Sequence, residues 1–266
     1  MNVIEFLGIP GSGKSTAARA LLQIAKENGL PVYSLDSGLL KVFLGFRAFA
    51  YTTVLLNEEN KLKAAKKIFH HFYYPRYEKL FTRHFQSLGT HLHVKETPGS
   101  DQQHKRKLAE WFLNFGARYM FLQQYLNQDS SLIISEGFVN RTAGLFNDGH
   151  SMDNQTVLRL LNDTLGVEHR FVSIQSDEEL CYQRLEKRGF TYRLKGRTES
   201  DIRSFLHLTA GQCALLADYF HTQGNTMIFV KNNTGVDCLK EELSLRLPEL
   251  LNEARSAEFK ESNLCS

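Results

Sequence analysis

The residue types that mark secreted, zinc-binding or membrane-inserted proteins are scarce in this sequence of 266 residues. The four cysteines lie far apart with no C-x-x-C spacing, which is typical of reduced thiols and not of disulfides or a zinc site. They are Cys181, Cys213, Cys238 and Cys265. No apolar run approaches the roughly 20 residues that a membrane span needs. The first residues also lack the charged and then apolar pattern of a signal peptide. We therefore expect a cytoplasmic protein.

The sequence also has little excess of either charge, since it contains 32 basic and 29 acidic residues and its formal net charge is only +3. This balance gives no argument for a polyanionic partner, so we do not expect nucleic acid or a membrane as partner. With 42% hydrophobic residues the chain can bury one large core. We expect a single domain over residues 1–253 and a polar, frayed tail over 254–266.

What the sequence does contain is a complete G-x-x-x-x-G-K-[ST] phosphate-binding loop (P-loop) at residues 8–15. Its glycines let successive backbone N–H groups turn inward around an anion, and the following helix adds the positive end of its dipole. Lys14 can reach the β- and γ-phosphates of ATP, and the Ser15 hydroxyl can ligate Mg²⁺. The residues expected to bind ATP here are Gly8, Pro10, Gly11, Ser12, Gly13, Lys14, Ser15 and Thr16.

The segments that flank the loop predict a βαβ unit. Residues 2–7 are mostly apolar and read as a buried strand, 16–28 as an amphipathic helix, and 30–35 as a second strand. Because ligands collect at the carboxyl ends of parallel strands, Asp36 is placed near the P-loop. It is a candidate catalytic base or an anchor for an acceptor hydroxyl. The alternative is that Asp36 caps the next turn.

A second acidic residue, Glu136, follows a predicted strand at residues 131–135. Apolar or small residues followed by an acid form the Walker-B pattern, in which the acid holds a magnesium-bound water or polarises the acceptor hydroxyl. We assign Glu136 as a catalytic and magnesium-binding residue. The alternative is an acid that merely ends a strand.

Basic residues concentrate in a predicted lid at about residues 184–197, after a strand at 169–175 and a capping box at 176–179. Guanidinium groups can bridge the oxygens of the transferred phosphoryl group, and Arg188 is the first candidate because the helix fixes it. The alternative is a solvated basic face. The other lid residues expected to bind ATP are Arg184, Arg193 and Arg197.

A helical insertion is predicted at about residues 39–90. Its lysine-rich helix, 57–72, should end or kink at Pro75. Aromatic residues at 77, 81 and 85 indicate either a packed core face or a stacking surface for a ring. A long helix over 102–126 carries Arg118 on an apolar face, where a guanidinium needs either a substrate phosphate or a salt bridge.

Several of these segments resemble P-loop kinases. Residues 6–44, FLGIPGSGKSTAARALLQIAKENGLPVYSLDSGLLKVFL, resemble the opening of adenylylsulfate kinases, and more broadly P-loop kinases of nucleotides and other small molecules. The KETPG sequence at 95–99 and the FGAR sequence at 115–118 resemble acceptor-binding segments of thymidylate kinases. The E-x-x-x-x-R-x-x-x-R-G helix resembles a nucleoside kinase lid. The E-R-S segment of deoxynucleoside kinases corresponds here to Glu136-Gly137-Phe138, with Arg141 as the nearest arginine.

This resemblance implies a three-layer α/β sandwich around a five-stranded parallel sheet of order 2-3-1-4-5. It also implies acceptor contacts, in addition to Asp36, from Lys95, Phe115, Arg118 and Arg141, and a contact between adenine and the loop that contains Asn233. We expect Mg²⁺- and ATP-dependent phosphoryl transfer to a small nucleotide- or nucleoside-like acceptor, and a homodimer is compatible with this. The alternatives are a polynucleotide 5′-hydroxyl kinase and an NTP-hydrolysing switch protein.

Overall fold

The structure, a computed structural model, describes residues 1–85, 102–146, 154–162, 165, 169–190 and 194–251. Its centre is a five-stranded sheet of order β2-β3-β1-β4-β5 in which all neighbouring strands are parallel. The strands are β1 (Asn2–Leu7), β2 (Val32–Ser34), β3 (Ser131–Ile134), β4 (His169–Gln175) and β5 (Met227–Lys231). The predicted fold class and strand order are therefore confirmed.

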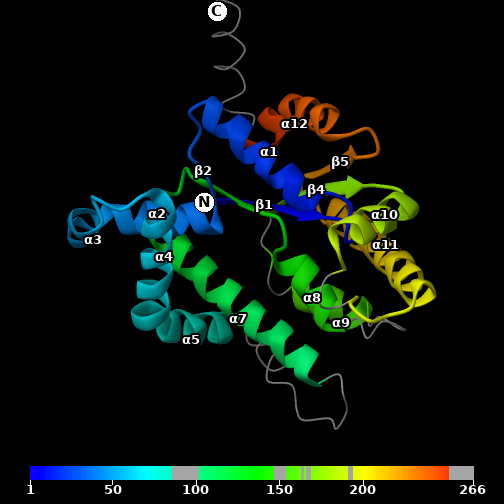
Figure 1. The fold of residues 1–266 in the computed structure, drawn as a ribbon, viewed down its shortest axis with the longest axis horizontal. Helices are drawn as coiled ribbons and strands as arrows, with labels where there is room; N and C mark the ends of the chain where they lie inside the picture. Colours follow the sequence, from blue (N-terminus) through cyan, green and yellow to red (C-terminus); the bar gives the residue numbers. More distant parts are fainter. Residues whose placement is uncertain (86–101, 147–153, 163–164, 166–168, 191–193, 252–266) are drawn as a thin grey trace, which may run out of the picture.

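Helices cover both faces of the sheet (Figure 1). One face packs against α1 (Lys14–Glu27) and α12 (Val236–Leu251), and the other packs against α7 (Gln102–Tyr125), α8 (Phe138–Phe146) and α11 (Glu199–Thr222). The side chains of β1 alternate between the two cores. Ile4 and Phe6 join the core under α1 and α12, whereas Val3 and Leu7 join the core on the α7 side. Glu5 lies between the latter two and so also points to the α7 side.

The helices between β2 and β3 cover the predicted insertion at about residues 39–90 and extend beyond it on both sides. They are α2 (Leu35–Gly45), α3 (Arg47–Thr52), α4 (Glu58–Ile68), a π-helical turn η1 (Phe69–Tyr73), α5 (Tyr74–His84) and α7. Pro75 lies in the first turn of α5, directly after the π-helical turn η1, so the hydrogen-bonding pattern of the helix changes just before the proline. Tyr77, Phe81 and Phe85 are buried in the core, which confirms the core-packing interpretation of this aromatic stripe.

Three local expectations were wrong or incomplete. The second strand ends at Ser34, so Asp36 lies in the first turn of α2 and not at a strand end. Helix α8 was not predicted. It is only nine residues long and begins two residues after Glu136, the acid at the end of the predicted strand. The capping box at the start of α10 (Glu178–Arg188) is absent, because the Asp177 side chain accepts a hydrogen bond from Asn233 instead.

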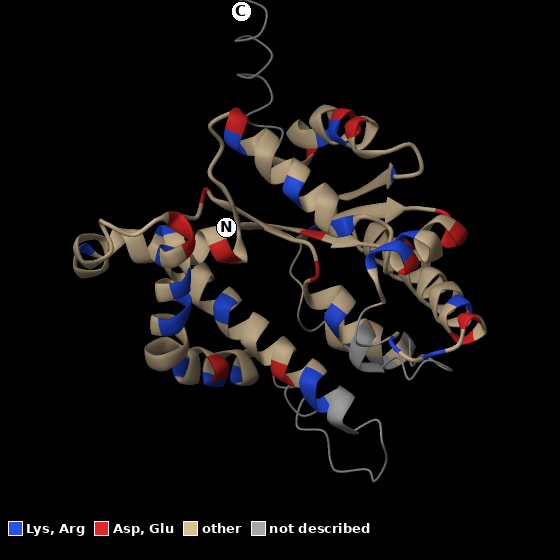
Figure 2. Ribbon diagram, in the orientation of Figure 1, with Lys and Arg blue, Asp and Glu red and all other residues tan. Residues whose placement is uncertain are grey.

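Acidic and basic positions are interspersed over the outer helices (Figure 2), in agreement with the small net charge. Helix α9 (Asn154–Asn162) packs beside α8. Among the described residues, no helix is long and apolar enough to cross a membrane. The tail at 254–266 lies outside the described residues.

Candidate functional site

The P-loop connects the end of β1 to the start of α1 and has the backbone geometry of an anion nest. Gly8, Gly11 and Gly13 have φ values of 143°, 87° and 98°, which L side chains rarely adopt. At Gly11 a Cβ atom would also lie 2.5 Å from the carbonyl oxygen of Cys181. Glycine is therefore required at this position by both conformation and space.

Lys14, the first residue of α1, is 7% exposed and lies over this loop. Its Nζ donates hydrogen bonds to the carbonyl oxygens of Gly8 at 2.7 Å and Ile9 at 3.0 Å. Burial lowers the pKa of the ammonium group, and the nearby Glu136 carboxylate opposes that shift. A partly desolvated cation held at the loop is suited to bind phosphate oxygens.

Two side chains hold the P-loop carbonyls from outside the nest. Asn232, which follows β5, donates from Nδ2 to the Ser12 carbonyl at 2.7 Å and is 5% exposed. Arg184 of α10 donates to the carbonyls of Gly11 at 3.4 Å and Asn232 at 2.9 Å. Arg184 was predicted to bind phosphate, but the structure places its guanidinium on the loop backbone.

The predicted adenine contact Asn233 is exposed and pairs with Asp177. Its Oδ1 accepts from the Asp177 N–H at 3.2 Å, and its Nδ2 donates to the Asp177 carboxylate at 3.0 Å. The residue that bonds to the P-loop backbone is its neighbour Asn232. The only sequence signal for Asn232 is its position directly after a buried strand.

A cavity of about 450 Å³ opens beside the P-loop, within the size range of small-molecule sites. Many of the predicted site residues line it, namely Gly8, Pro10, Gly11, Gly13, Lys14, Ser15, Thr16, Glu136, Arg141 and Arg188. Apolar side chains also line it, among them Leu108, Trp111, Leu194, Phe205 and Leu216. The cavity therefore offers charged groups for phosphates and apolar side chains for a flat or hydrophobic group.

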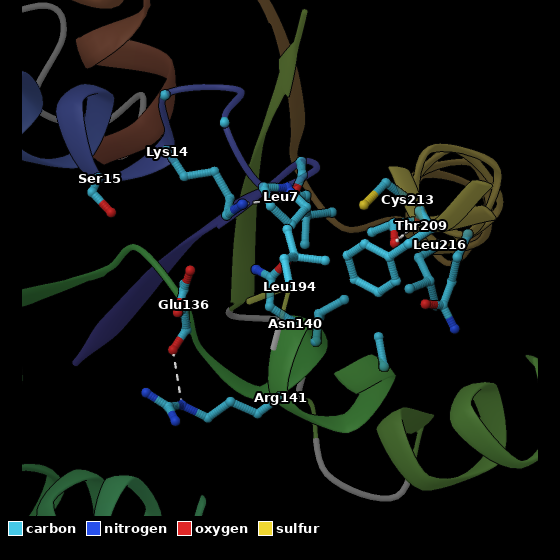
Figure 3. Close-up of a pocket in the computed structure, with 18 of the residues that line it drawn as sticks. Leu7, Lys14, Ser15, Glu136, Asn140, Arg141, Leu194, Thr209, Cys213 and Leu216 are labelled. Atoms are coloured by element: carbon cyan, nitrogen blue, oxygen red, sulfur yellow. Dashed lines mark hydrogen bonds between the residues drawn. The ribbon is translucent and has the colours of Figure 1, made fainter. Parts of the chain in front are cut away.

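Glu136 and Arg141 form the side of the cavity that faces the P-loop (Figure 3). Arg141 Nε donates to the backbone carbonyl of Glu136 at 3.0 Å, and its guanidinium lies over the Phe115 ring at 5.0 Å from the centroid. Burial lowers the pKa of Arg141, and the two carboxylates Glu136 and Glu5 oppose that shift. A half-buried guanidinium between these groups is held in a defined position and can bind an anion.

Asp36 is not among the cavity-lining residues; it lies in a group of ion pairs that joins three helices. Its carboxylate accepts from Lys66 of α4 at 2.6 Å and from Arg118 of α7 at 3.2 Å. The anionic partner of Arg118 in this structure is thus a side chain. Arg118 also lowers the pKa of Arg141, because the two positive charges repel each other.

Phe115 was predicted to contact the acceptor. The structure places Phe112, Phe115 and Tyr119 in the core, where they pack around Phe138 of α8. Helical spacing directs these rings inward, so they are not available for stacking on an acceptor. Trp111 is 52% exposed and lines the cavity.

The predicted lid is described in part. Arg188 lines the cavity, Arg197 is half-buried, and Arg193 lies outside the described residues, as does Lys95 with its loop. Leu194 anchors this segment, because it is 1% exposed and packs in a cluster with Ile9 and Tyr182.

Comparison with known proteins gives a likeness of fold. No family model matches the sequence, and no curated protein sequence matches it. Among solved structures, the chain is similar to a deoxyadenosine kinase from M. mycoides, whose structure holds the products dCMP and a flexible dCDP. The TM-score is 0.50 at 10% identity, over 93% of this chain and 99% of that one. The match gives no support to the adenylylsulfate kinase detail of the sequence resemblance. At this identity it shows that the chain has the P-loop kinase fold.

Proposed function

We propose that this protein is a kinase that transfers the γ-phosphoryl group of ATP to a small nucleoside- or nucleotide-like acceptor. The observation that carries the proposal is the position of Lys14. Its buried ammonium group opens on the same cavity as Glu136, Arg141 and Arg188. A phosphate-binding loop that faces an acid and two arginines across a cavity is the arrangement that phosphoryl transfer requires.

Mg²⁺ fits the donors at the P-loop end of the cavity. Ser15 and Glu136 both line it and supply a hydroxyl and a carboxylate, the hard oxygen ligands that Mg²⁺ prefers. Within the described residues no group of three or more His, Cys, Asp or Glu could hold a metal, but Mg²⁺ in kinases needs only one or two protein carboxylates beside the phosphates. Bound there, Mg²⁺ would neutralise charge on the β- and γ-phosphates.

The protein groups have separable roles in this proposal. The P-loop N–H groups and Lys14 bind the phosphates, while Arg141 and Arg188 stabilise the charge that spreads over the transferred group. Asp36 accepts the proton of the acceptor hydroxyl or orients that hydroxyl. Because Asp36 does not line the P-loop cavity, this role requires an acceptor that extends beyond the cavity.

The acceptor class is inferred from the chemistry of the cavity. Trp111 and Leu108 offer an apolar surface for a ring, and Arg141 offers a cation. This combination suits a nucleoside or nucleotide better than a neutral sugar, which would need several hydroxyl-directed acids and amides. The deoxyadenosine kinase likeness supports the same class through its fold.

The test is a screen for acceptor-dependent ADP release with nucleosides, nucleotides, sugars and adenylylsulfate, each with and without Mg²⁺. We expect release above background only with a nucleoside- or nucleotide-like acceptor and only with Mg²⁺. Equal release without any acceptor would favour the NTP-hydrolysing switch. Turnover only with 5′-hydroxyl oligonucleotides would favour the polynucleotide kinase.

A further inference from the structure

Glu5 is a buried acid in an otherwise mostly apolar central strand. It lies in β1, the middle strand of the sheet, and has no exposed surface. A carboxyl group at such a position is costly unless hydrogen bonds or charges compensate for its lost hydration. It does not line the cavity and cannot touch a substrate there.

The compensation comes from the first turn of α8. The Glu5 carboxylate accepts backbone N–H bonds from Phe138 at 3.0 Å, Val139 at 2.8 Å and Asn140 at 3.4 Å. These are the N–H groups that a helix start leaves without partners, so Glu5 caps α8 from another element. A second contact joins the same elements, because Asn140 Nδ2 donates to the Phe6 carbonyl at 2.7 Å.

The start of α8 and strand β1 also approach each other closely at Gly137. A Cβ atom at Gly137 would lie 2.6 Å from the carboxyl carbon of Glu5. Glycine at this position therefore lets the chain pass directly over the carboxylate. The residues on either side of this contact, Glu136 and Arg141, both line the cavity.

We propose that Glu5 is a positioning residue for the catalytic site. By binding the first turn of α8 to β1, it fixes Glu136 and Arg141 opposite the P-loop, which begins at the end of the same strand. One strand would then set the relative position of both sides of the cavity. The effect on catalysis rests on the proposed function. The contact between Glu5 and α8 does not, and it is tested by a measurement that needs no activity.

The first experiment measures amide hydrogen exchange at residues 138–140 in the wild type and in Glu5→Gln. The amide is the same size and its oxygen can still accept from two of the donors, but its NH₂ group opposes the remaining backbone N–H instead of accepting from it. We expect exchange at these amides to be about tenfold faster or more in the variant. Val3→Ala is the matched control, since it removes buried volume from the same strand face and should leave this exchange unchanged.

The second experiment measures kinetics and MgADP binding in the same variants. Misplacement of groups around a reacting centre costs about 10- to 100-fold in rate. We expect a fall of this size in kcat for Glu5→Gln, weaker coupling between Mg²⁺ and ADP binding, and little change in ADP affinity without Mg²⁺. Gly137→Ala, which keeps the acid but fills the space over it, should reproduce these effects. This variant serves as the test if Glu5→Gln fails to fold.

Unchanged exchange at residues 138–140 in both variants would overturn the inference. So would faster exchange with kcat and Mg²⁺ coupling equal to those of Val3→Ala. If the wild type transfers phosphate to no acceptor, the proposed function fails, and exchange together with MgADP binding still decides whether Glu5 positions this side of the cavity.

Discussion

Asn232 is the residue whose loss should most directly disturb the phosphate loop. Its buried amide donates to the Ser12 carbonyl. The amide also lies so close to Gly13 that a side chain at position 13 would collide with it. In Asn232→Ala that carbonyl loses its partner, at a cost of about 1–3 kcal/mol in the free energy of unfolding. Because the N–H groups of the nest lose their fixed orientation, KM for ATP should rise by about tenfold. Denaturant unfolding and steady-state kinetics measure the two effects.

Asn233→Ala is the control for this prediction. Its contacts with Asp177 are exposed, so the change should cost less than about 0.5 kcal/mol and leave KM for ATP near the wild-type value. A large rise in KM for Asn233→Ala together with a small one for Asn232→Ala would reverse the two assignments. That result would support Asn233 as the adenine contact that the sequence predicts.

Glu5 should give the stability of the protein a characteristic pH dependence. Burial raises the pKa of its carboxyl group from 4.5 to about 7, although the N–H groups of α8 and the Arg141 charge oppose the shift. Between these values the folded state holds a proton that the unfolded state has released. The stabilisation is therefore complete below the unfolded pKa and is lost as the pH rises through the folded pKa.

The measurement compares the unfolding free energies of the wild type and Glu5→Gln at about pH 5 and about pH 8. Other titrating groups are shared and cancel in the difference. The wild type should lose on the order of 1–3 kcal/mol relative to the variant over this range. Parallel curves would mean that Glu5 keeps the same charge in both states, and a relative gain would mean that its pKa is lowered.

At the scale of elements, Asp36 joins α2, α4 and α7 through Lys66 and Arg118. Both ion pairs are partly exposed, with side-chain exposures of 43% for Asp36 and 24% for Arg118. Arg118→Met leaves Lys66 as a partner for the acid, so the loss in unfolding free energy should stay near 1 kcal/mol. If Arg118 serves the acceptor together with Arg141, KM for the acceptor should rise and KM for ATP should not.

Lys66→Met provides the matched comparison, because it breaks the other ion pair of the same carboxylate. Arg118, unlike Lys66, acts on the pKa of the cavity-lining Arg141. We expect similar stability losses in the two variants and a much larger acceptor KM effect for Arg118→Met. A loss of about 3–5 kcal/mol with an unchanged acceptor KM would show that Arg118 is purely structural.

The elements that the sequence predicted well are those with strong local signals. A short local sequence pattern is enough to predict each of three elements: the apolar strand His169–Gln175, the glycine-rich loop and the long amphipathic helix α7. Helix α8 is different, since its first turn is stabilised by Glu5, more than 130 residues away in the chain. No local pattern around residue 138 contains that information.

At the scale of the whole molecule, topology accounts for what could be predicted of the site. Parallel strands bring the P-loop and Glu136 to the same edge of the sheet, and the structure places both on one cavity. Side-chain partners could not be predicted in the same way. The engagement of Arg184 with the loop backbone, the burial of Phe115 and the pairing of Asp36 depend on packing between distant segments.

Transfer of labelled γ-phosphate from ATP to an acceptor, by the wild type and by Lys14→Ala, tests the central claim most directly. Lys14 is the cation held at the P-loop, so its loss should abolish formation of labelled product. The fold should persist, as measured by circular dichroism and the unfolding midpoint, because the glycines and the Asn232 contact keep the loop. The account predicts labelled product from the wild type and none above background from the variant. Labelled product formed at the wild-type rate by a well-folded Lys14→Ala protein would contradict it.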